Sequence, residues 1–382
     1  MPLPRIPARF IPIDLPRAPE DNLSAVRERL LDAIRKRRMT AHKGEKPVAR
    51  DELTAGDFDE MFPMASTDEG TASDDFNRAQ RRATNYLAAR ERKLAAVAHL
   101  KRHEKELIQR AIYGSQAFGV VTSDQVDERI AAIHADFPWL AKASTLLMHH
   151  LRRRAEQGRT PTHLPPMILL GPPGIAKSSW ARAVADAFNL PAIEIDVGAT
   201  NGATFSIAGV ERGWGTAAPG RVVSTMLRER VSNPLVILDE IDKIPEAVVT
   251  SRGTSLPGAF EVLKSMIEPI TARNWICPFH QIPFDLSGVS WVMTTNSIDR
   301  MPAAFLDRCR VVRVDGPNPE QLKALAGPLV ARLVASDDED IILTIVHQML
   351  DRSFRRCETV SMRRLSRFIE DAARIETRPR LI

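Results

Sequence analysis

The feature that most constrains the fold of this chain is the stretch MILLGPPGIAKSSWARAVADA, residues 167–187. Four apolar residues, 167–170, predict a short buried strand, and a turn rich in glycine and proline follows them. A segment of helical character then begins at Lys177. From Gly171 onward the spacing fits the pattern G-x-x-x-x-G-K-[ST], except that Ala176 occupies the second glycine position. The stretch therefore predicts a phosphate-binding loop between a strand and a helix.

Each residue type in this loop has a chemical reason. Backbone N–H groups of the loop and of the helix N-terminus hold phosphate oxygens, and the helix dipole favours their negative charge. Lys177 is expected to contact the β- and γ-phosphates, and the Ser178 hydroxyl to bind Mg²⁺. An ordinary turn before a helix is the alternative, which the flanking strand and helix disfavour. The residues expected to bind ATP here are Gly171, Pro172, Pro173, Gly174, Ile175, Ala176, Lys177, Ser178 and Ser179.

The composition is typical of a globular protein, with 44% apolar and 26% charged residues. No run of 18 apolar residues occurs, so we expect no membrane span, and the proline-rich start does not resemble a signal peptide. Cys277, Cys309 and Cys357 are far apart and odd in number, which predicts neither a disulfide framework nor a metal site. A cytoplasmic location is the simplest expectation.

The positive charge of the chain is unevenly distributed. The formal net charge is only +5, but residues 35–43 (RKRRMTAHK) and the segment 78–110 carry much of the excess. A basic face of this kind can bind nucleic acid or an acidic partner. More often such a face is the solvated surface of a helix. The sequence leaves these readings open.

The pattern along the chain predicts three parts. Residues 1–118 form a mostly helical region of unknown role, with helices expected over 22–38 and, as one long helix, over 76–113. Residues 119–316 form an α/β nucleotide-binding domain with a helical lead-in over 121–160. Residues 317–382 form a small helical lid. Apolar runs that alternate with helical segments predict a parallel sheet. Its expected strands are 167–170, 192–197, 235–238, 289–294 and 311–314.

Polar residues follow two of these predicted strands. In PLVILDEIDKI a buried strand ends at Asp239 and Glu240, and in WVMTTNS another ends at Asn296. Ligands collect at the carboxyl ends of parallel strands, so these side chains are expected to meet the loop. Asp239 would bind Mg²⁺, and Glu240 would act as general base on the attacking water. Asn296 would orient that water.

The order of these motifs resembles the ATPase module of the AAA+ superfamily. The chain looks most like the Lon branch, because GPPGIAKSSWA, NPLVILDEIDKI, AFEVLKSMIEP and FHQIPFDLSGVSWVMTTNS all follow the pattern of that branch. The resemblance covers roughly residues 120–380. It implies an ATP-hydrolysing P-loop domain followed by a helical lid, which assembles into a ring, expected to be a hexamer, and acts on a protein substrate.

The resemblance also implies roles for residues outside the loop. Asn296 falls at the sensor-one position. Arg308, in FLDRCR, falls at the position of the arginine finger that reaches the nucleotide of the neighbouring subunit, with Arg310 as the less favoured choice. Arg363, in SMRRLSR, falls at the sensor-two position on the lid, with Arg364 as the alternative register.

One further residue is implicated in substrate handling. Trp214, in RGWGTAAPG, falls where these motors carry the pore-loop aromatic that grips an extended polypeptide. A Trp buried as a loop anchor is the alternative. The sequence alone does not decide between an exposed and a buried indole at this position.

The sequence departs from the family pattern at three places. The peptidase domain of the Lon branch would follow the lid, but the chain ends at Ile382, so we expect no proteolytic site. Ala176 adds a methyl group to the phosphate loop and would weaken binding if that position needs a positive φ. Residues 1–115 do not resemble the usual substrate-binding domain. The sequence therefore predicts an ATP-driven remodeller; a nucleic-acid-associated ATPase, such as a loader or a mobile-element or phage helper, and a non-hydrolysing ATP switch are the alternatives.

Overall fold

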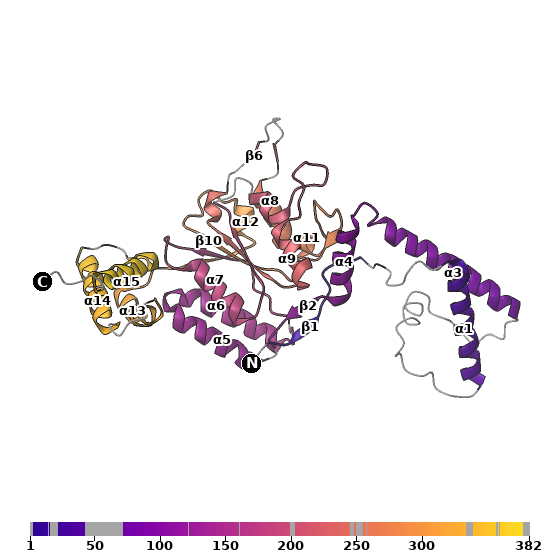
Figure 1. Ribbon diagram of the computed structural model, residues 1–382, viewed down its shortest axis with the longest axis horizontal. Helices are drawn as coiled ribbons and strands as arrows, with labels where there is room; N and C mark the ends of the chain where they lie inside the picture. The colour runs from indigo at the N-terminus through magenta and orange to yellow at the C-terminus, as the bar shows by residue number, and fades with distance from the viewer. Residues whose placement is uncertain are drawn as a thin grey trace. The chain divides into compact units, whose positions relative to one another are not determined.

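The computed structural model describes residues 3–13, 15, 22–42, 72–120, 122–159, 161–198, 203–244, 248–249, 255–256, 258–333, 339–356, 358 and 360–376. The chain divides into two compact units (Figure 1). Unit 1 comprises Met1–Pro12 and Glu106–Ile382, and unit 2 comprises Ile13–Lys105. Each unit is described by itself below.

A five-stranded parallel sheet forms the centre of unit 1 and has the strand order β11-β3-β10-β5-β4. The predicted α/β fold is therefore confirmed. Every residue of β10 is buried, as expected for a central strand covered on both faces. The strands are β3 (Met167–Leu170), β4 (Ala192–Asp196), β5 (Leu235–Asp239), β10 (Ser290–Thr295) and β11 (Arg310–Arg313).

The strand order separates β3 from β4, although they are consecutive in the chain. β5 and β10 lie between them, so the connections from β3 and from β10 leave the sheet toward different sides. In open α/β sheets this arrangement creates a crevice beyond the carboxyl ends of the strands. The register places Leu170 beside Thr295 and Asp196 beside Asp239, so those carboxyl ends lie together.

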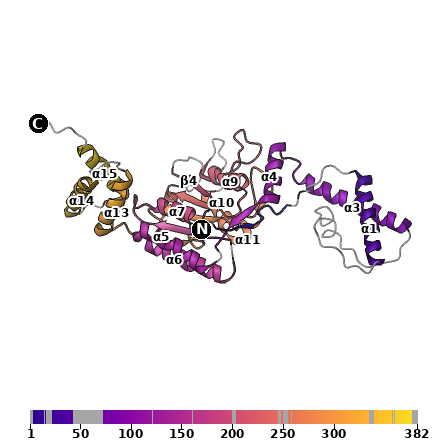
Figure 2. The same ribbon diagram turned by 60° about the horizontal axis from the view of Figure 1, so that its bottom comes forward.

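Helices cover both faces of the sheet. Figures 1 and 2 show α5, α6 and α7 together on one side and α8 and α9 on the other. The core on the α5–α7 side includes Trp180, Leu147 and Phe188, all fully buried. The helices of this part are α5 (Ser123–Asp136), α6 (Ala141–Glu156), α7 (Lys177–Ala187), α8 (Ala203–Ala208), α9 (Arg221–Glu229), α10 (Ala259–Ile267), α11 (Pro269–Ala272) and α12 (Ala303–Leu306).

Short elements complete unit 1 around this sheet. The turns of 3₁₀ helix and the two-residue strands are η1 (Pro138–Leu140), η2 (Ile241–Lys243), β6 (Val248–Val249), β7 (Ser255–Leu256), β8 (Trp275–Ile276) and β9 (Pro283–Phe284). β6 pairs with β7 and β8 pairs with β9, in both cases antiparallel.

The N-terminal residues belong to unit 1 because they pair with its chain. β1 (Arg5–Pro7) is antiparallel to β2 (Gln116–Phe118), and Phe10 is buried against Phe284 with ring centroids 6.4 Å apart. The predicted domain boundary at residue 118 therefore lies within unit 1. A contiguous domain over 1–118 does not describe the compact units, since residues 13–105 alone form unit 2.

The lid is a bundle of three helices, as the sequence predicts. α13 (Pro319–Leu333), α14 (Glu339–Arg355) and α15 (Met362–Glu376) bury their own apolar cluster, which includes Leu322, Val346, Leu350, Leu365 and Ile369. The bundle can therefore keep its shape if its position against the sheet changes.

Unit 2 is built on α1 (Leu23–His42), which packs on α3 (Ala72–Ala95). The prediction of one long helix over 76–113 is wrong, because α3 ends at Ala95 and α4 (Arg102–Gly114) starts a new helix. Val97 and Leu100 turn inward between them, with 2% and 4% of their surface exposed. The Lys101 N–H then donates to the Glu104 carboxylate at 2.7 Å, which caps the start of α4.

Two expectations about composition can be compared with the described residues. No helix in those parts of the chain is long and apolar enough to cross a membrane. Cys277 and Cys309 are free thiols, and Cys357 lies outside the described residues. Burial raises the pKa of the Cys277 thiol to about 11, so it is protonated at neutral pH.

Candidate functional site

The phosphate loop connects β3 to α7 and contains two residues with positive φ. Gly174 has φ +75°, and Ala176 adopts the left-handed conformation with φ 66° and ψ 32°. Ala176, which replaces the second glycine of the motif, therefore lies where the backbone needs the conformation that glycine adopts most easily. Gly171 is required for another reason, since a Cβ there would lie 2.3 Å from the Val314 carbonyl oxygen.

Lys177 is held in place by the loop that precedes it. Its ammonium donates to the carbonyl oxygens of Gly171 at 2.6 Å and Pro172 at 2.9 Å, and to Asn296 Oδ1 at 3.1 Å. The residue is only 7% exposed. Burial lowers the pKa of this ammonium, and nearby carboxylates act in the opposite direction. A phosphate that took over these hydrogen bonds would stabilise the charged form.

Ser178 and Asp239 meet at the bottom of the crevice. The Ser178 hydroxyl donates to Asp239 Oδ1 at 2.5 Å, and the Thr294 hydroxyl donates to the same oxygen at 3.0 Å. A hydroxyl oxygen beside a carboxylate is a donor set that Mg²⁺ prefers, and it usually keeps several water ligands. The predicted metal ligands therefore fit the ion, and they come from different elements, α7 and β5.

Glu240 and Asn296 lie at the ends of neighbouring strands and both line the same cavity. Glu240 directly follows β5 and adopts a left-handed conformation with φ 57°. Its backbone N–H donates to the Thr294 hydroxyl at 3.2 Å. This bond connects Glu240, the predicted general base, to β10, the strand that Asn296 follows. The positive φ of Glu240 turns the chain away from the sheet just after Asp239.

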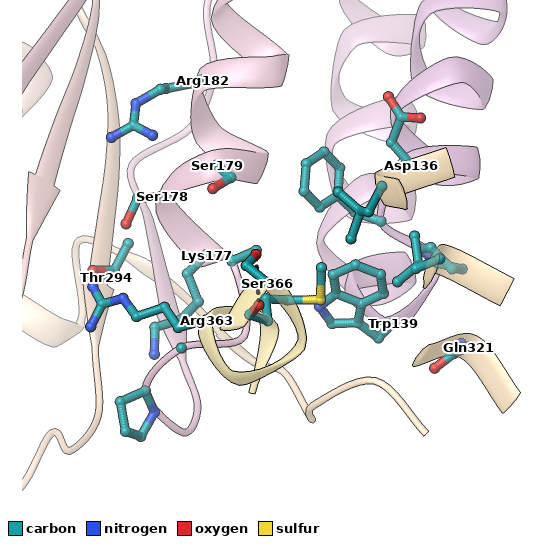
Figure 3. Close-up of a pocket in the computed structure, with 18 of the residues that line it drawn as sticks. Asp136, Trp139, Lys177, Ser178, Ser179, Arg182, Thr294, Gln321, Arg363 and Ser366 are labelled. Carbon is teal, nitrogen blue, oxygen red and sulfur yellow. Dashed lines mark hydrogen bonds between the residues drawn. The ribbon is translucent and has the colours of Figure 1, made fainter. Parts of the chain in front are cut away.

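The cavity has a volume of about 930 Å³ and lies between the carboxyl ends of the strands and the lid. Figure 3 shows Lys177 and Ser178 of α7 together with Arg363 and Ser366 of α15 around this cavity. The lid also contacts the loop directly, since the Met362 N–H donates to the Gly174 carbonyl at 2.9 Å. A ligand in this cavity would thus contact both the sheet and the lid.

Sequence reasoning did not identify several residues that line the cavity. Trp139 of η1 lies against the loop, because its indole N–H donates to the Ile175 carbonyl at 2.8 Å; Figure 3 shows this residue at the cavity. Gln321 of α13 and Asp196 at the end of β4 also line it. The FPW break in the helical lead-in and the final Asp of a predicted strand were the available signals.

The structure distinguishes the two lid arginines. Arg363 lines the cavity. Arg364 instead forms an ion pair with Glu358, and its guanidinium lies over the Phe368 ring at 5.4 Å. Arg363, the residue that the sequence favours for the sensor-two position, is thus the one that lies at the cavity.

Neither arginine expected at the finger position lines the cavity of its own chain. Arg308 Nε donates to Glu268 at 2.7 Å, and its Nη1 donates to the Ala304 carbonyl at 2.6 Å. Arg310 begins β11 and is exposed, with its backbone N–H bonded to the Pro166 carbonyl. A role for either residue at a nucleotide requires a second copy of the chain.

Trp214 is not a buried anchor. It is 53% exposed on the loop between α8 and α9, which Gly209 and Pro219 close with a bridge at its base. Arg212 tethers this loop, because its Nε donates to the Phe279 carbonyl at 3.0 Å and its guanidinium lies 4.6 Å from the Phe279 ring centroid. The exposed indole is thus presented by a loop with a fixed base.

A parallel sheet, a phosphate loop and an acidic strand end define the class of P-loop nucleotide-binding domains. Residues 167–315 match the family described as "ATPase family associated with various cellular activities (AAA)". Over these residues the chain is similar to the AAA family, and the resemblance to the Lon branch is confirmed over this region.

Several proteins that are similar to this chain are Lon proteases. The chain is 29% identical over 207 residues to the mitochondrial Lon protease homolog of Yarrowia lipolytica, which spans 53% of this chain and 17% of that protein. It is 33% identical over 160 residues to Lon protease 4 of Sorangium cellulosum, covering 42% and 19%. It is 28% identical over 213 residues to Lon protease of Amoebophilus asiaticus, covering 55% and 24%. The matches thus span about a fifth of these relatives.

Proposed function

We propose that the chain is an ATP-hydrolysing motor that remodels or translocates a protein substrate. The convergence of Lys177, Ser178, Asp239, Glu240 and Asn296 on one cavity carries the proposal. These side chains come from α7, β5 and β10, which are far apart in sequence. They supply a phosphate-binding cation, metal ligands, a base and a water-orienting amide. The proposal assigns ATP hydrolysis to these residues and no peptidase activity.

In the proposed reaction, water attacks the γ-phosphorus and the bond to the bridging oxygen of ADP breaks. Glu240 accepts the proton of the water, and Asn296 orients it. Lys177 exchanges the loop carbonyls for phosphate oxygens, which neutralises charge that builds up as the bond breaks. Ser178 and Asp239 would bind Mg²⁺, which supplies further charge neutralisation to the β- and γ-phosphates. The products are ADP and inorganic phosphate.

Ring formation is part of the proposal because Arg308 lies outside its own cavity. An arginine finger that acts on a neighbour's nucleotide requires adjacent subunits, and we propose a hexamer on the resemblance to AAA+ motors. Arg363 on the lid would connect the state of the nucleotide to the lid position. We place this assembly in the cytoplasm, in keeping with the free thiols of Cys277 and Cys309.

Trp214 supports a polypeptide as the substrate. An exposed aromatic side chain offers a large apolar contact to any extended chain, whatever its sequence. The Arg212 tether limits how far the loop moves, so force from the nucleotide domain can reach the indole. An aromatic residue on a loose loop would lose more entropy on each contact.

The test is steady-state ATP hydrolysis at protein concentrations that allow rings to form. Wild-type protein should turn over ATP, Lys177→Ala should not, and Glu240→Gln should bind ATP but hydrolyse it at least 100-fold more slowly. Glu229→Gln, an exposed carboxylate away from the cavity, is the matched control and should behave as wild type. Normal turnover in Glu240→Gln would contradict the mechanism. ATP binding without turnover in the wild type would instead favour the non-hydrolysing switch.

The substrate class needs a separate measurement. An unfolded protein should stimulate the ATPase of the wild type, and Trp214→Ala should abolish this stimulation and keep the basal rate. Stimulation by DNA and not by unfolded protein would contradict a protein substrate. Equal stimulation of wild type and Trp214→Ala would remove the indole from the mechanism.

A further inference from the structure

The helices α1 and α3 of unit 2 both carry an excess of positive charge. α1 has six Arg or Lys residues against two acidic ones, and α3 has six against three. Their excess of seven positive charges is larger than the net charge of +5 of the whole chain. Acidic residues elsewhere in the chain offset this excess, and both helices lie away in sequence from every residue of the nucleotide cavity.

Most of the cations of α3 lie on one side of the helix. At about 100° per residue, five of the six fall within an arc of about 120°. The buried face, marked by Ala79 and Ala83 at 0% exposure, is centred about 120° from the centre of this arc. We call the five cations the basic stripe: Arg78, Arg81, Arg82, Arg92 and Lys93.

Besides the five cations, the arc of the basic stripe includes only small side chains. Between its ends only Asn85 and Ala89 share the arc, and no acidic residue occurs between Asp75 and Glu91. Arg81 and Arg92 are exposed, and the other three cations are half-buried. From Arg78 to Lys93 the stripe extends about 22 Å along the helix axis.

This composition favours a phosphate backbone over a protein as the partner. Protein interfaces are anchored by aromatic and other large side chains at a core that is poor in charge, and the stripe offers no such anchor. Four of its five cations are arginines, whose planar guanidinium matches phosphate oxygens in pairs. Recognition by charge alone suits a regular row of phosphates.

The charged face of α1 provides an internal comparison. Arg29 and Lys36 are exposed there, but Glu28 and Asp32 alternate with them, and Lys36 pairs with Asp32 at 3.4 Å. Charges of both signs interleaved in this way are typical of a solvated helix surface. The stripe of α3 has no such alternation.

We propose that the basic stripe of α3 binds the phosphate backbone of nucleic acid without sequence preference. The stripe belongs to unit 2, so the proposal does not depend on the nucleotide site or on ATP hydrolysis. Binding would place the ATPase module on a nucleic acid, whatever substrate the module then acts on.

The test measures binding of the full chain to a fluorescent 30-base-pair DNA duplex by anisotropy between 50 and 200 mM KCl. If about four or five phosphates are contacted, the affinity should fall between 10²- and 10³-fold over this range. The double variant Arg81→Glu/Arg92→Glu should bind at least tenfold more weakly, with a salt dependence reduced by about two phosphate contacts. Lys177→Ala should bind DNA as the wild type does.

The control changes the net charge equally on the other helix. Arg29→Glu/Lys36→Glu on α1 should keep the affinity within threefold of wild type, and circular dichroism should show that both variants stay helical. An equal loss of DNA affinity in the two double variants would contradict binding at the basic stripe, because the net charge alone would then explain the affinity. Absence of binding by the wild type, or binding of polyglutamate as tight as that of DNA, would overturn nucleic acid as the partner.

Discussion

The left-handed backbone at Ala176 leads to a quantitative prediction for Ala176→Gly. The conformation, with φ 66° and ψ 32°, costs an L-residue about 1–2 kcal/mol. Glycine avoids this cost but gains about 0.4–1 kcal/mol of extra freedom in the unfolded chain. The variant should therefore raise the free energy of unfolding by up to about 1.6 kcal/mol, with a central value of about 0.8 kcal/mol. For a unit of this size the melting temperature should rise by about 1–4 °C.

The assay is thermal unfolding of both proteins, with a nucleotide titration in parallel. Gln281→Gly is the matched control, because Gln281 has φ 53° in the turn between β8 and β9 and does not line the cavity. Its glycine variant should be stabilised by a similar amount. Nucleotide affinity should stay within threefold of wild type in both variants, since the loop holds this conformation without a ligand.

Two results would refute this reasoning. If Gln281→Gly is stabilised and Ala176→Gly is not, the packing of the Ala176 methyl against the core outweighs the backbone cost. If Ala176→Gly gains more than tenfold in nucleotide affinity, Ala176 leaves the left-handed region when no nucleotide is bound. The free-energy cost of that conformation is then paid when the nucleotide binds. The second result would mean that Ala176 weakens ATP binding itself.

Three further predictions concern the site and its loop. Asp239→Asn should weaken nucleotide binding at least tenfold in Mg²⁺ but little in EDTA, because a carboxamide is a poorer metal ligand; a fluorescent-nucleotide titration measures both. Burial lowers the pKa of Lys177 and bound phosphate raises it, so ATP affinity should fall as the pH rises through the free-state value. Calorimetry in two buffers at an alkaline pH below the ordinary lysine value of 10.5 should show proton uptake that Lys177→Arg lacks. Arg212→Ala removes the tether to Phe279, so chymotrypsin should cleave after Trp214 several-fold faster while the melting temperature changes little.

The sheet and the lid were predictable because each strand is a short apolar run and each helix keeps a regular apolar spacing. All five predicted strands occur within one or two residues of their expected bounds. The break before α4 was not predictable in this way. Val97 and Leu100 continue the helical spacing of apolar residues, so the break shows only in the structure, where turns follow Ala95 and the bond from Lys101 to Glu104 caps α4.

The phosphate-binding half of the site was predictable because its residues follow strands in a fixed order. Neighbouring parallel strands end at one edge, so Asp239 and Asn296 had to lie near Lys177. Trp139 and Gln321 had no such constraint. Their place at the cavity depends on how the lead-in and the lid pack against the loop, and neither local propensity nor spacing encodes that packing.

The ion pair of Arg308 within its own chain bears on its proposed role at the nucleotide of a neighbouring subunit. Its guanidinium pairs with Glu268 at 2.7 Å, and the two side chains are 33% and 31% exposed. An ion pair that is this exposed contributes at most about 1 kcal/mol. A phosphate with several negative charges can replace one carboxylate, because bidentate contacts with phosphate are at least as favourable. The pair with Glu268 therefore orients Arg308 at low energetic cost and leaves it able to turn to a neighbour's nucleotide.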